Sequence, residues 1–222
     1  MNYIIVDFEM NPIAREYIDE IKISQHEIME IGAVLMDENF LVIDEFMTFV
    51  KPQYNQRVHK RYETLTGIST QMVSGAPPFS IAYEMFVDWC ESHGKEYEIY
   101  AWSDNDLKQL VAEMKLKNYN NLRKIEPIYK WYDFQKEFKD KLCLENVISL
   151  KKALYYIGIK FDGRMHDALC DAKNTAELFA ITRDKNRSTK ELNIVMEALK
   201  PKNINDTLGD LFDFGELMSQ VD

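Results

Sequence analysis

The chain has 222 residues, of which 46% are apolar and 29% are charged, and its formal net charge at pH 7 is −10. A chain of this size buries one sizeable core without disulfides or metals, and its apolar runs fall short of the roughly 18 residues that span a bilayer, which excludes a transmembrane protein. The negative balance argues against a protein that coats nucleic acid through bulk attraction, because such binding needs many Lys and Arg side chains.

The first third of the chain predicts a buried strand followed by a hairpin. Residues 3–8 form a short apolar run rich in β-branched and aromatic side chains, which is typical of a strand buried on both faces. Residues 28–36 and 41–50 are further strand-like runs, joined by polar residues at hairpin length. Residues 51–78 are rich in Gly and Pro, which indicates short helical pieces joined by turns.

The middle of the chain alternates between strands and helices. Residues 79–89 repeat apolar side chains every three or four positions, the pattern of an amphipathic helix. Further strands are predicted at residues 98–102 and 128–134, and further helices at residues 103–114, 134–142, 150–157 and 168–181. This alternation after a hairpin predicts an α/β fold, with a mixed five-stranded sheet and helices on both faces.

The sequence changes character near residue 186. Residues 188–199 can form a helix, Pro201 ends it, and residues 206–222 form an acidic amphipathic tail. We therefore expect one domain over residues 1–185 and a C-terminal helical, acidic extension over residues 186–222. The extension is a candidate site for a protein partner.

The cysteines and the N-terminal residues predict the cellular compartment of the protein. Cys90, Cys143 and Cys170 form no C-x-x-C pair, so reduced structural thiols are expected instead of disulfides or a thiolate zinc site. Asp7 and Glu9 occur too early for a secretory signal. We expect a cytoplasmic protein with no membrane partner.

The first candidate for chemistry is a pair of acids on the first predicted strand. Asp7 and Glu9 are two residues apart, so their side chains project from the same side of that strand. Like charges at that range repel each other and raise a pKa unless a cation lies between them. Mg²⁺ and Mn²⁺ suit an all-carboxylate shell better than zinc does. The alternative is that Asp7 ends the strand and Glu9 is solvated, and the pair alone does not decide.

Two later segments carry further acids and a histidine. Ser103 and Asp106 have the spacing of a capping box, which alone favours a structural role for Asp106. Asp167 is a good N-cap for the helix that follows it, which leaves His166 in the preceding loop and Asp171 one turn inside the helix. An acid on a packing face, as expected for Asp171, needs a partner.

The order of these residues resembles a known enzyme family. D-x-E on the first strand, D near the middle and H-x4-D near the end resemble the DEDDh branch of the DnaQ-like 3′–5′ exonucleases, which have a ribonuclease H-like fold. The likeness covers about residues 1–185. Residues 30–34, 65–68 and 163–164 resemble the members that trim RNA 3′ ends in RNA interference and histone-message turnover. For the second motif, Asp106 is chosen over Asp104 because Leu110 follows it by four residues.

The resemblance implies a metal-dependent exonuclease that hydrolyses phosphodiester bonds at the 3′ end of single-stranded nucleic acid, RNA being favoured over DNA, and releases nucleoside 5′-monophosphates. It implies that His166 takes a proton from the attacking water, since imidazole exchanges protons near neutral pH. Two divalent cations, Mg²⁺ or Mn²⁺, are expected on four ligands: Asp7, Glu9, Asp106 and Asp171. The expected substrate contacts are apolar side chains that stack on the terminal base and one cation that follows phosphates: Phe8, Met10, Leu65, Ile68 and Arg164.

Departures from the family pattern leave the substrate open. Met10 and Asn11 follow Glu9, where family members usually carry small residues or Thr. Residues 12–27 are longer and more acidic than the corresponding part of the simplest members. Two alternatives come from other classes: a catalytically idle nucleic-acid-binding or regulatory module of the same fold, and a dimetal phosphatase for free nucleotides. The complete acid set argues against the first, because an idle site has no need for clustered carboxylates, and the second needs a closed pocket.

Overall fold

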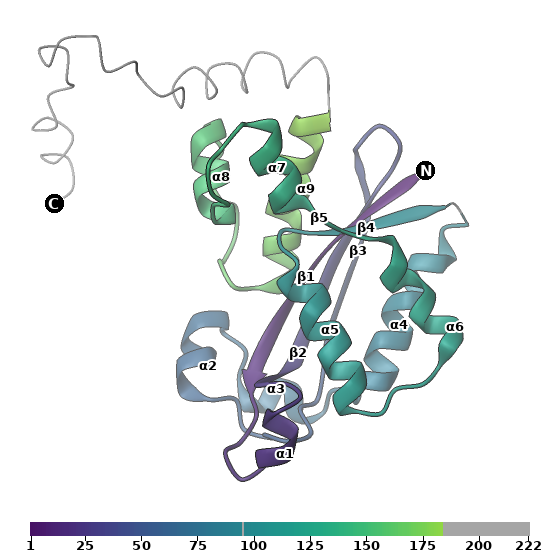
Figure 1. The fold of residues 1–222 in the computed structure, drawn as a ribbon, viewed down its shortest axis with the longest axis vertical. Coiled ribbons are helices and arrows are strands. Elements are labelled where there is room, and N and C mark those ends of the chain that lie inside the picture. Colours follow the sequence, from purple (N-terminus) through teal and green to yellow (C-terminus); the bar gives the residue numbers. More distant parts are fainter. Residues whose placement is uncertain (95, 184–222) are drawn as a thin grey trace, which may run out of the picture.

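A mixed five-stranded sheet forms the centre of the protein, for which the computed structural model describes residues 1–94 and 96–183. The strand order is β3-β2-β1-β4-β5 (Figure 1). β1 (Asn2–Pro12) pairs antiparallel with β2 (His26–Met36) and parallel with β4 (Tyr97–Ala101), while β3 (Val42–Phe49) and β5 (Trp131–Asp133) form the two edges. The predicted mixed sheet is confirmed.

Helices cover both faces of this sheet. Two of them, α4 (Phe79–Ser92) and α5 (Asn105–Leu116), pack on one face. Three others, α7 (Phe134–Lys141), α8 (Leu150–Ile157) and α9 (Ala168–Arg183), pack on the other face (Figure 1). The two faces therefore have separate hydrophobic cores, as predicted for a sheet that is buried on both sides.

The alternation of side chains along β1 supplies both cores. Ile4, Val6 and Phe8 belong to the core under α4 and α5, whereas Ile5 belongs to the core under α7–α9. Successive side chains of a strand point to opposite faces, so Asp7 and Glu9 share the α9 side with Ile5. The strand runs four residues beyond the predicted end because β2 pairs with it as far as Pro12.

Short helices connect β1 to β2 and β3 to α4. α1 (Ile18–Ile21) precedes β2, and α2 (Lys60–Thr66) and α3 (Thr70–Ser74) follow β3. The prediction of short helical pieces within residues 51–78 is confirmed by α2 and α3. α2 ends at Gly67, which has a left-handed backbone with φ of +81°.

The structure differs from the sequence prediction around β5 and at the start of α5. Residues 128–134 do not form one strand, because a short helix and a 3₁₀ helix, α6 (Leu122–Ile125) and η1 (Glu126–Lys130), leave only three residues for β5. Pro127 fits the first turn of η1, where its missing N–H is not needed. α5 begins at Asn105 and its N-cap is Asp104 instead of Ser103. The predicted C-terminal extension lies outside the described residues.

The N-terminus of α9 lies directly against β2. A Cβ atom at Gly32 would overlap the Ala168 carbonyl carbon and the Leu169 nitrogen. A glycine at this position lets the helix backbone approach the strand backbone, and the approach fixes the first turn of α9. No helix in the described ranges is both long and apolar enough to cross a membrane.

Candidate active site

The predicted catalytic residues line one cavity beside the second half of β1. It has a volume of about 590 Å³, and its lining includes the four predicted acids and the predicted histidine: Asp7, Glu9, Asp106, Asp171 and His166. These residues come from the central strand, from the first turn of α5, and from the loop and first turn of α9. Three segments far apart in the sequence therefore meet in one place.

Asp106 reaches the cavity because α5 begins beside β1. Its side chain is buried, and its Oδ1 accepts the backbone N–H of Phe8 at 3.1 Å. Asp104 does not line this cavity: its carboxylate pairs with Lys108 at 2.9 Å and with Lys136 at 3.1 Å, and these hydrogen bonds lower the pKa of Asp104. The geometry thus favours Asp106 over Asp104 as the second-motif acid.

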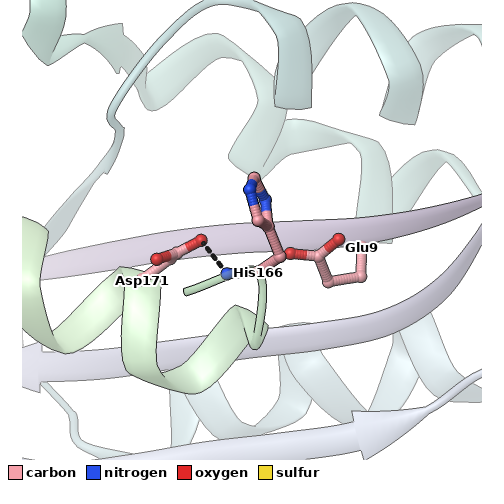
Figure 2. A group of neighbouring side chains, drawn as sticks. All are labelled: Glu9, His166 and Asp171. Atoms are coloured by element: carbon pink, nitrogen blue, oxygen red, sulfur yellow. Dashed lines mark hydrogen bonds between the residues drawn. The ribbon is translucent and has the colours of Figure 1, made fainter. Parts of the chain in front are cut away.

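A capped helix start holds His166 and Asp171 together. Asp167 accepts the N–H of Cys170 at 2.9 Å, as expected for an N-cap residue. The backbone N–H of His166 donates to Asp171 Oδ2 at 3.1 Å, and Figure 2 shows the imidazole pointing away from that contact. His166 is exposed and has a φ of +62°, so its loop is held in a conformation that non-glycine residues rarely adopt.

Burial and repulsion from neighbouring acids raise the pKa values of all four acids, the neighbour of Asp171 being Asp167. Burial is the largest cause in each case: it raises the pKa of Glu9 to about 8, that of Asp106 to about 7 and that of Asp171 to about 6. The pKa of Asp7 is raised well above its usual value by burial and then by Asp106, Asp171 and Glu9. No Lys or Arg of the described residues forms an ion pair with these carboxylates. The cavity therefore holds four clustered acids that have no ion-pair partner among the described residues, although Lys151 also lines it.

This donor set fits divalent metal ions. Ligand atoms of Glu9, His166 and Asp171 lie within 4.8 Å of one another, and the Asp7 and Asp106 carboxylates line the same cavity. Carboxylate oxygens are the donors that hard divalent cations prefer. A cation also removes the repulsion that raises these pKa values, so the residues present fit the metal ions implied by the family.

A fifth acid, Glu30, was not among the predicted site residues. It lies opposite Glu9 in the register of β1 and β2, and its Oε2 accepts the N–H of Ala168 at 3.1 Å. Burial raises the pKa of Glu30 to about 7. Glu30 thus holds the start of α9 beside the catalytic acids. The signal for it was the E-I-G-A-V segment, which had been used only as a family marker.

A second cavity adjoins the first on the side of α2 and α5. It has a volume of about 430 Å³, and Glu9 and Met10 line both cavities. The pairing of β1 with β2 shifts register between Glu9 and Met10, where Met29 of β2 is the extra residue, and Met10 packs on the side of α4 and α5. Leu65, from α2, lies on another wall, and His26 contributes its imidazole, which lies 3.0 Å from the Tyr62 hydroxyl.

Two predicted substrate contacts are buried in hydrophobic cores. Phe8 is among the residues that line the 590 Å³ cavity, but it is only 3% exposed, and its ring packs against Trp131 in the core under α4 and α5. The alternation of side chains along β1 turns it away from the carboxylates. Ile68 is 2% exposed and belongs to a small core with Met29, Val58 and Val73. Met10 and Leu65 remain as the apolar side chains next to the acids.

Arg164 lies beside His166 but points towards α2. The two residues line a third cavity, of about 480 Å³, together with Arg61, Thr64 and Leu65. The Arg164 guanidinium donates to the carbonyl oxygen of Thr64 at 3.0 Å. The structure therefore places Arg164 near the site, with one of its donors already engaged by the protein.

The mixed sheet and its carboxylate cavity define a hydrolase of the ribonuclease H-like fold. The family model RNase_T, described as an exonuclease, matches residues 4–179. The chain therefore belongs to this exonuclease family, and the family membership predicted from the sequence is confirmed.

Individual relatives agree with this family. ERI1 exoribonuclease 2 from Danio rerio is 32% identical over 195 residues, which cover 79% of this chain and 34% of that protein. The 3′-5′ exonuclease Snipper from Drosophila melanogaster is 25% identical over 82% of this chain and 73% of its own length. The chain spans less than half the length of the first curated relatives it matches.

The fold agrees with a solved nuclease domain. The crystal structure of the nuclease domain of 3'hExo, a DEDDh family member bound to rAMP, aligns with a TM-score of 0.71 at 24% identity, over 84% of this chain and 94% of that domain. At this identity the likeness bears on the fold, and it confirms the ribonuclease H-like architecture.

Proposed function

We propose that the protein is a metal-dependent 3′–5′ exonuclease that hydrolyses the terminal phosphodiester bond of single-stranded nucleic acid and releases nucleoside 5′-monophosphates. The observation that carries this proposal is the convergence on a single cavity of one exposed imidazole and four carboxylates that have no ion-pair partner among the described residues. The names of the relatives, which include exoribonucleases, favour RNA as the substrate.

The proposed metal ions are Mg²⁺ or Mn²⁺, because all the clustered acids offer hard oxygen donors. Asp7, Glu9 and Asp171 would hold one ion, and Asp7 and Asp106 the other. Bound ions supply charge neutralisation for the attacking and leaving oxygens of a phosphoryl transfer.

The chain's own residues position the substrate and move the proton. Met10 and Leu65 offer apolar surface for the terminal base in the 430 Å³ cavity next to Glu9. A ring nitrogen of His166 accepts the proton of the attacking water, and the exposed position of its loop lets the imidazole reach the substrate. Asp171 accepts the His166 N–H and so holds this loop against the acids.

A labelled-substrate assay tests the proposal. Single-stranded RNA and DNA, labelled at the 3′ or the 5′ end, are incubated with the protein and Mg²⁺ or Mn²⁺. We expect shortening from the 3′ end, loss of activity in EDTA, and faster degradation of RNA. Asp106→Asn suppresses degradation, whereas Asp104→Asn, a change of the neighbouring acid outside the cavity, does not.

Other outcomes identify the alternatives. Binding of RNA without degradation, under both metals, supports an idle binding module. Release of inorganic phosphate from mononucleotides supports a phosphatase. Either result contradicts the proposed exonuclease activity.

A further inference from the structure

The Arg164 side chain crosses from the loop before α9 to the end of α2. Its Nη2 donates to the carbonyl oxygen of Thr64 at 3.0 Å and lies 3.5 Å from that of Leu65. The last carbonyls of a helix have no partner within the helix, and a cationic side chain at this end is favourable. Arg164 thus caps α2 from another part of the chain.

Gly67 makes this contact sterically feasible. A Cβ atom at Gly67 would overlap Arg164 Nη1 and would lie 2.5 Å from Cζ. The guanidinium therefore rests on the bare backbone of the residue that ends α2. A side chain at position 67 and the Arg164 guanidinium cannot occupy this place together.

The other end of the contact is a tightly constrained loop. Gly163 and His166, on either side of Arg164, have φ values of +81° and +62°. A Cβ atom at Gly163 would lie 2.7 Å from Cys170 Sγ, in the first turn of α9. The loop is thus held at α9 by close packing and at α2 by Arg164.

We infer that Arg164 is a positioning residue, which ties the helix that carries Leu65 to the loop that carries His166. This inference rests on the proposed function, in which Leu65 contacts the terminal base and His166 takes the proton. It replaces the sequence-based prediction that Arg164 follows the phosphates. The contact keeps Leu65, on the wall of the 430 Å³ cavity, at a fixed distance and orientation from His166.

Removing the guanidinium tests the inference directly. Arg164→Ala is expected to lower kcat by about tenfold or more, because small misplacements of a catalytic group cost rates of this order. The melting temperature stays nearly unchanged, since Arg164 is exposed. Arg164→Lys recovers only part of the rate, because an ammonium can donate to a carbonyl but lacks the planar guanidinium that packs on the Gly67 backbone.

A pair of glycine variants separates this contact from backbone strain. Gly67 and Gly158 both end a helix in the left-handed conformation, with φ of +81° and +78°. A Cβ atom at Gly158 meets nothing within 4 Å. Gly67→Ala is expected to lower kcat like Arg164→Ala, whereas Gly158→Ala carries similar backbone strain and keeps the rate. The double variant Gly67→Ala/Arg164→Ala is no slower than the worse single variant, because both remove one interaction.

Hydrogen exchange gives a readout that does not depend on activity. Amides of residues 163–167 should exchange faster in Arg164→Ala and Gly67→Ala than in the wild type. In Gly158→Ala their exchange rates should equal those of the wild type. Unchanged exchange in the first two variants overturns the inference even in an active enzyme. A higher KM at constant kcat in Arg164→Ala, with normal activity of Gly67→Ala, overturns it in favour of a phosphate contact. An inactive wild type with the expected exchange pattern contradicts the proposed function and leaves the tie intact.

Discussion

Two groups of buried acids in this protein are stabilised in different ways. The active-site cluster comprises five carboxylates: Asp7, Glu9, Glu30, Asp106 and Asp171. The Lys117 cluster comprises Glu27, Glu113 and Lys117, and it joins the start of β2 to the end of α5. Lys117 forms ion pairs with both acids of its cluster, and Glu27 also accepts the backbone N–H groups of Gln53, Tyr54 and Asn55.

The difference shows which buried charge is structural and which is kept for a ligand. A raised pKa does not separate the two groups, because burial also raises the pKa of Glu113 to about 7. The presence of a paired cation separates them. Lys117 forms ion pairs with the acids of its own cluster, whereas no Lys or Arg of the described residues pairs with the active-site cluster. Burying several acids together without a paired Lys or Arg is costly, so the presence of this cluster indicates a cation that comes from solution.

The largest expected effect is on catalysis. Asp7→Asn should lower exonuclease activity by at least about a thousandfold, because it removes a carboxylate expected to contact both ions. The same change should leave the metal-free protein at least as stable as the wild type, since it relieves repulsion among buried acids. Activity assays and urea unfolding in EDTA measure the two effects. A clear loss of metal-free stability would contradict the comparison.

The matching change in the Lys117 cluster should have the opposite sign. Glu27→Gln is expected to destabilise the protein by about 3 to 5 kcal/mol, because it leaves Lys117 partly uncompensated in the interior. Urea unfolding measures this loss, with Glu16→Gln, a change of an exposed acid, as the control. A loss below about 1 kcal/mol would mean that Lys117 finds water or another acid.

The stability of the metal-free protein should depend on pH. Burial raises the folded-state pKa of Glu9 from its usual 4.5 to about 8, so between these values the folded state holds a proton that the unfolded state has lost. The free energy of unfolding must then fall as the pH rises through this window. Urea unfolding at pH 5 and pH 8 in EDTA measures the fall. Saturating Mg²⁺ should flatten it, because metal binds the deprotonated acids, and an equal slope with and without Mg²⁺ would argue against a metal site.

The smallest effect is expected at the second acid of the Lys117 cluster. Glu113 accepts the N–H of Ile28 at 3.2 Å and the amide of Gln109 at 3.1 Å, and a glutamine retains an acceptor oxygen for these donors. Because Lys117 keeps Glu27 as its partner, Glu113→Gln should change the unfolding free energy by less than about 1 kcal/mol. A loss as large as that of Glu27→Gln would show that the cluster acts as one unit.

Local rules of sequence were enough to predict most of the site. Alternation along a strand put Asp7 and Glu9 on one face, and helix capping put His166 outside α9 with Asp171 inside it. The same alternation turns the Phe8 side chain away from the acids. Phe8 was predicted as a substrate contact because it is next to Glu9 in the sequence. Met10 follows the same alternation, since it packs against the core that contains Phe8, and it lines the cavity beside α2 and α5.

Features that depend on distant contacts were out of reach. Glu30 lies in the site because β2 pairs with β1 in one register, which the sequence does not state. Asp104 and Asp106 differ in role because Lys136, which lies 32 residues beyond Asp104, reaches back to pair with it. Arg164 contacts a helix about 100 residues earlier in the chain.

The geometry of the cavity depends on Gly32, a residue that has no side chain. The α9 backbone occupies the space where a side chain at position 32 would go, and α9 carries Asp171 one turn from that contact. A single added methyl group there must shift the helix and displace a carboxylate that is proposed to bind metal, without altering any charge. Alanine at position 32 would therefore disable the chemistry of this enzyme through shape alone.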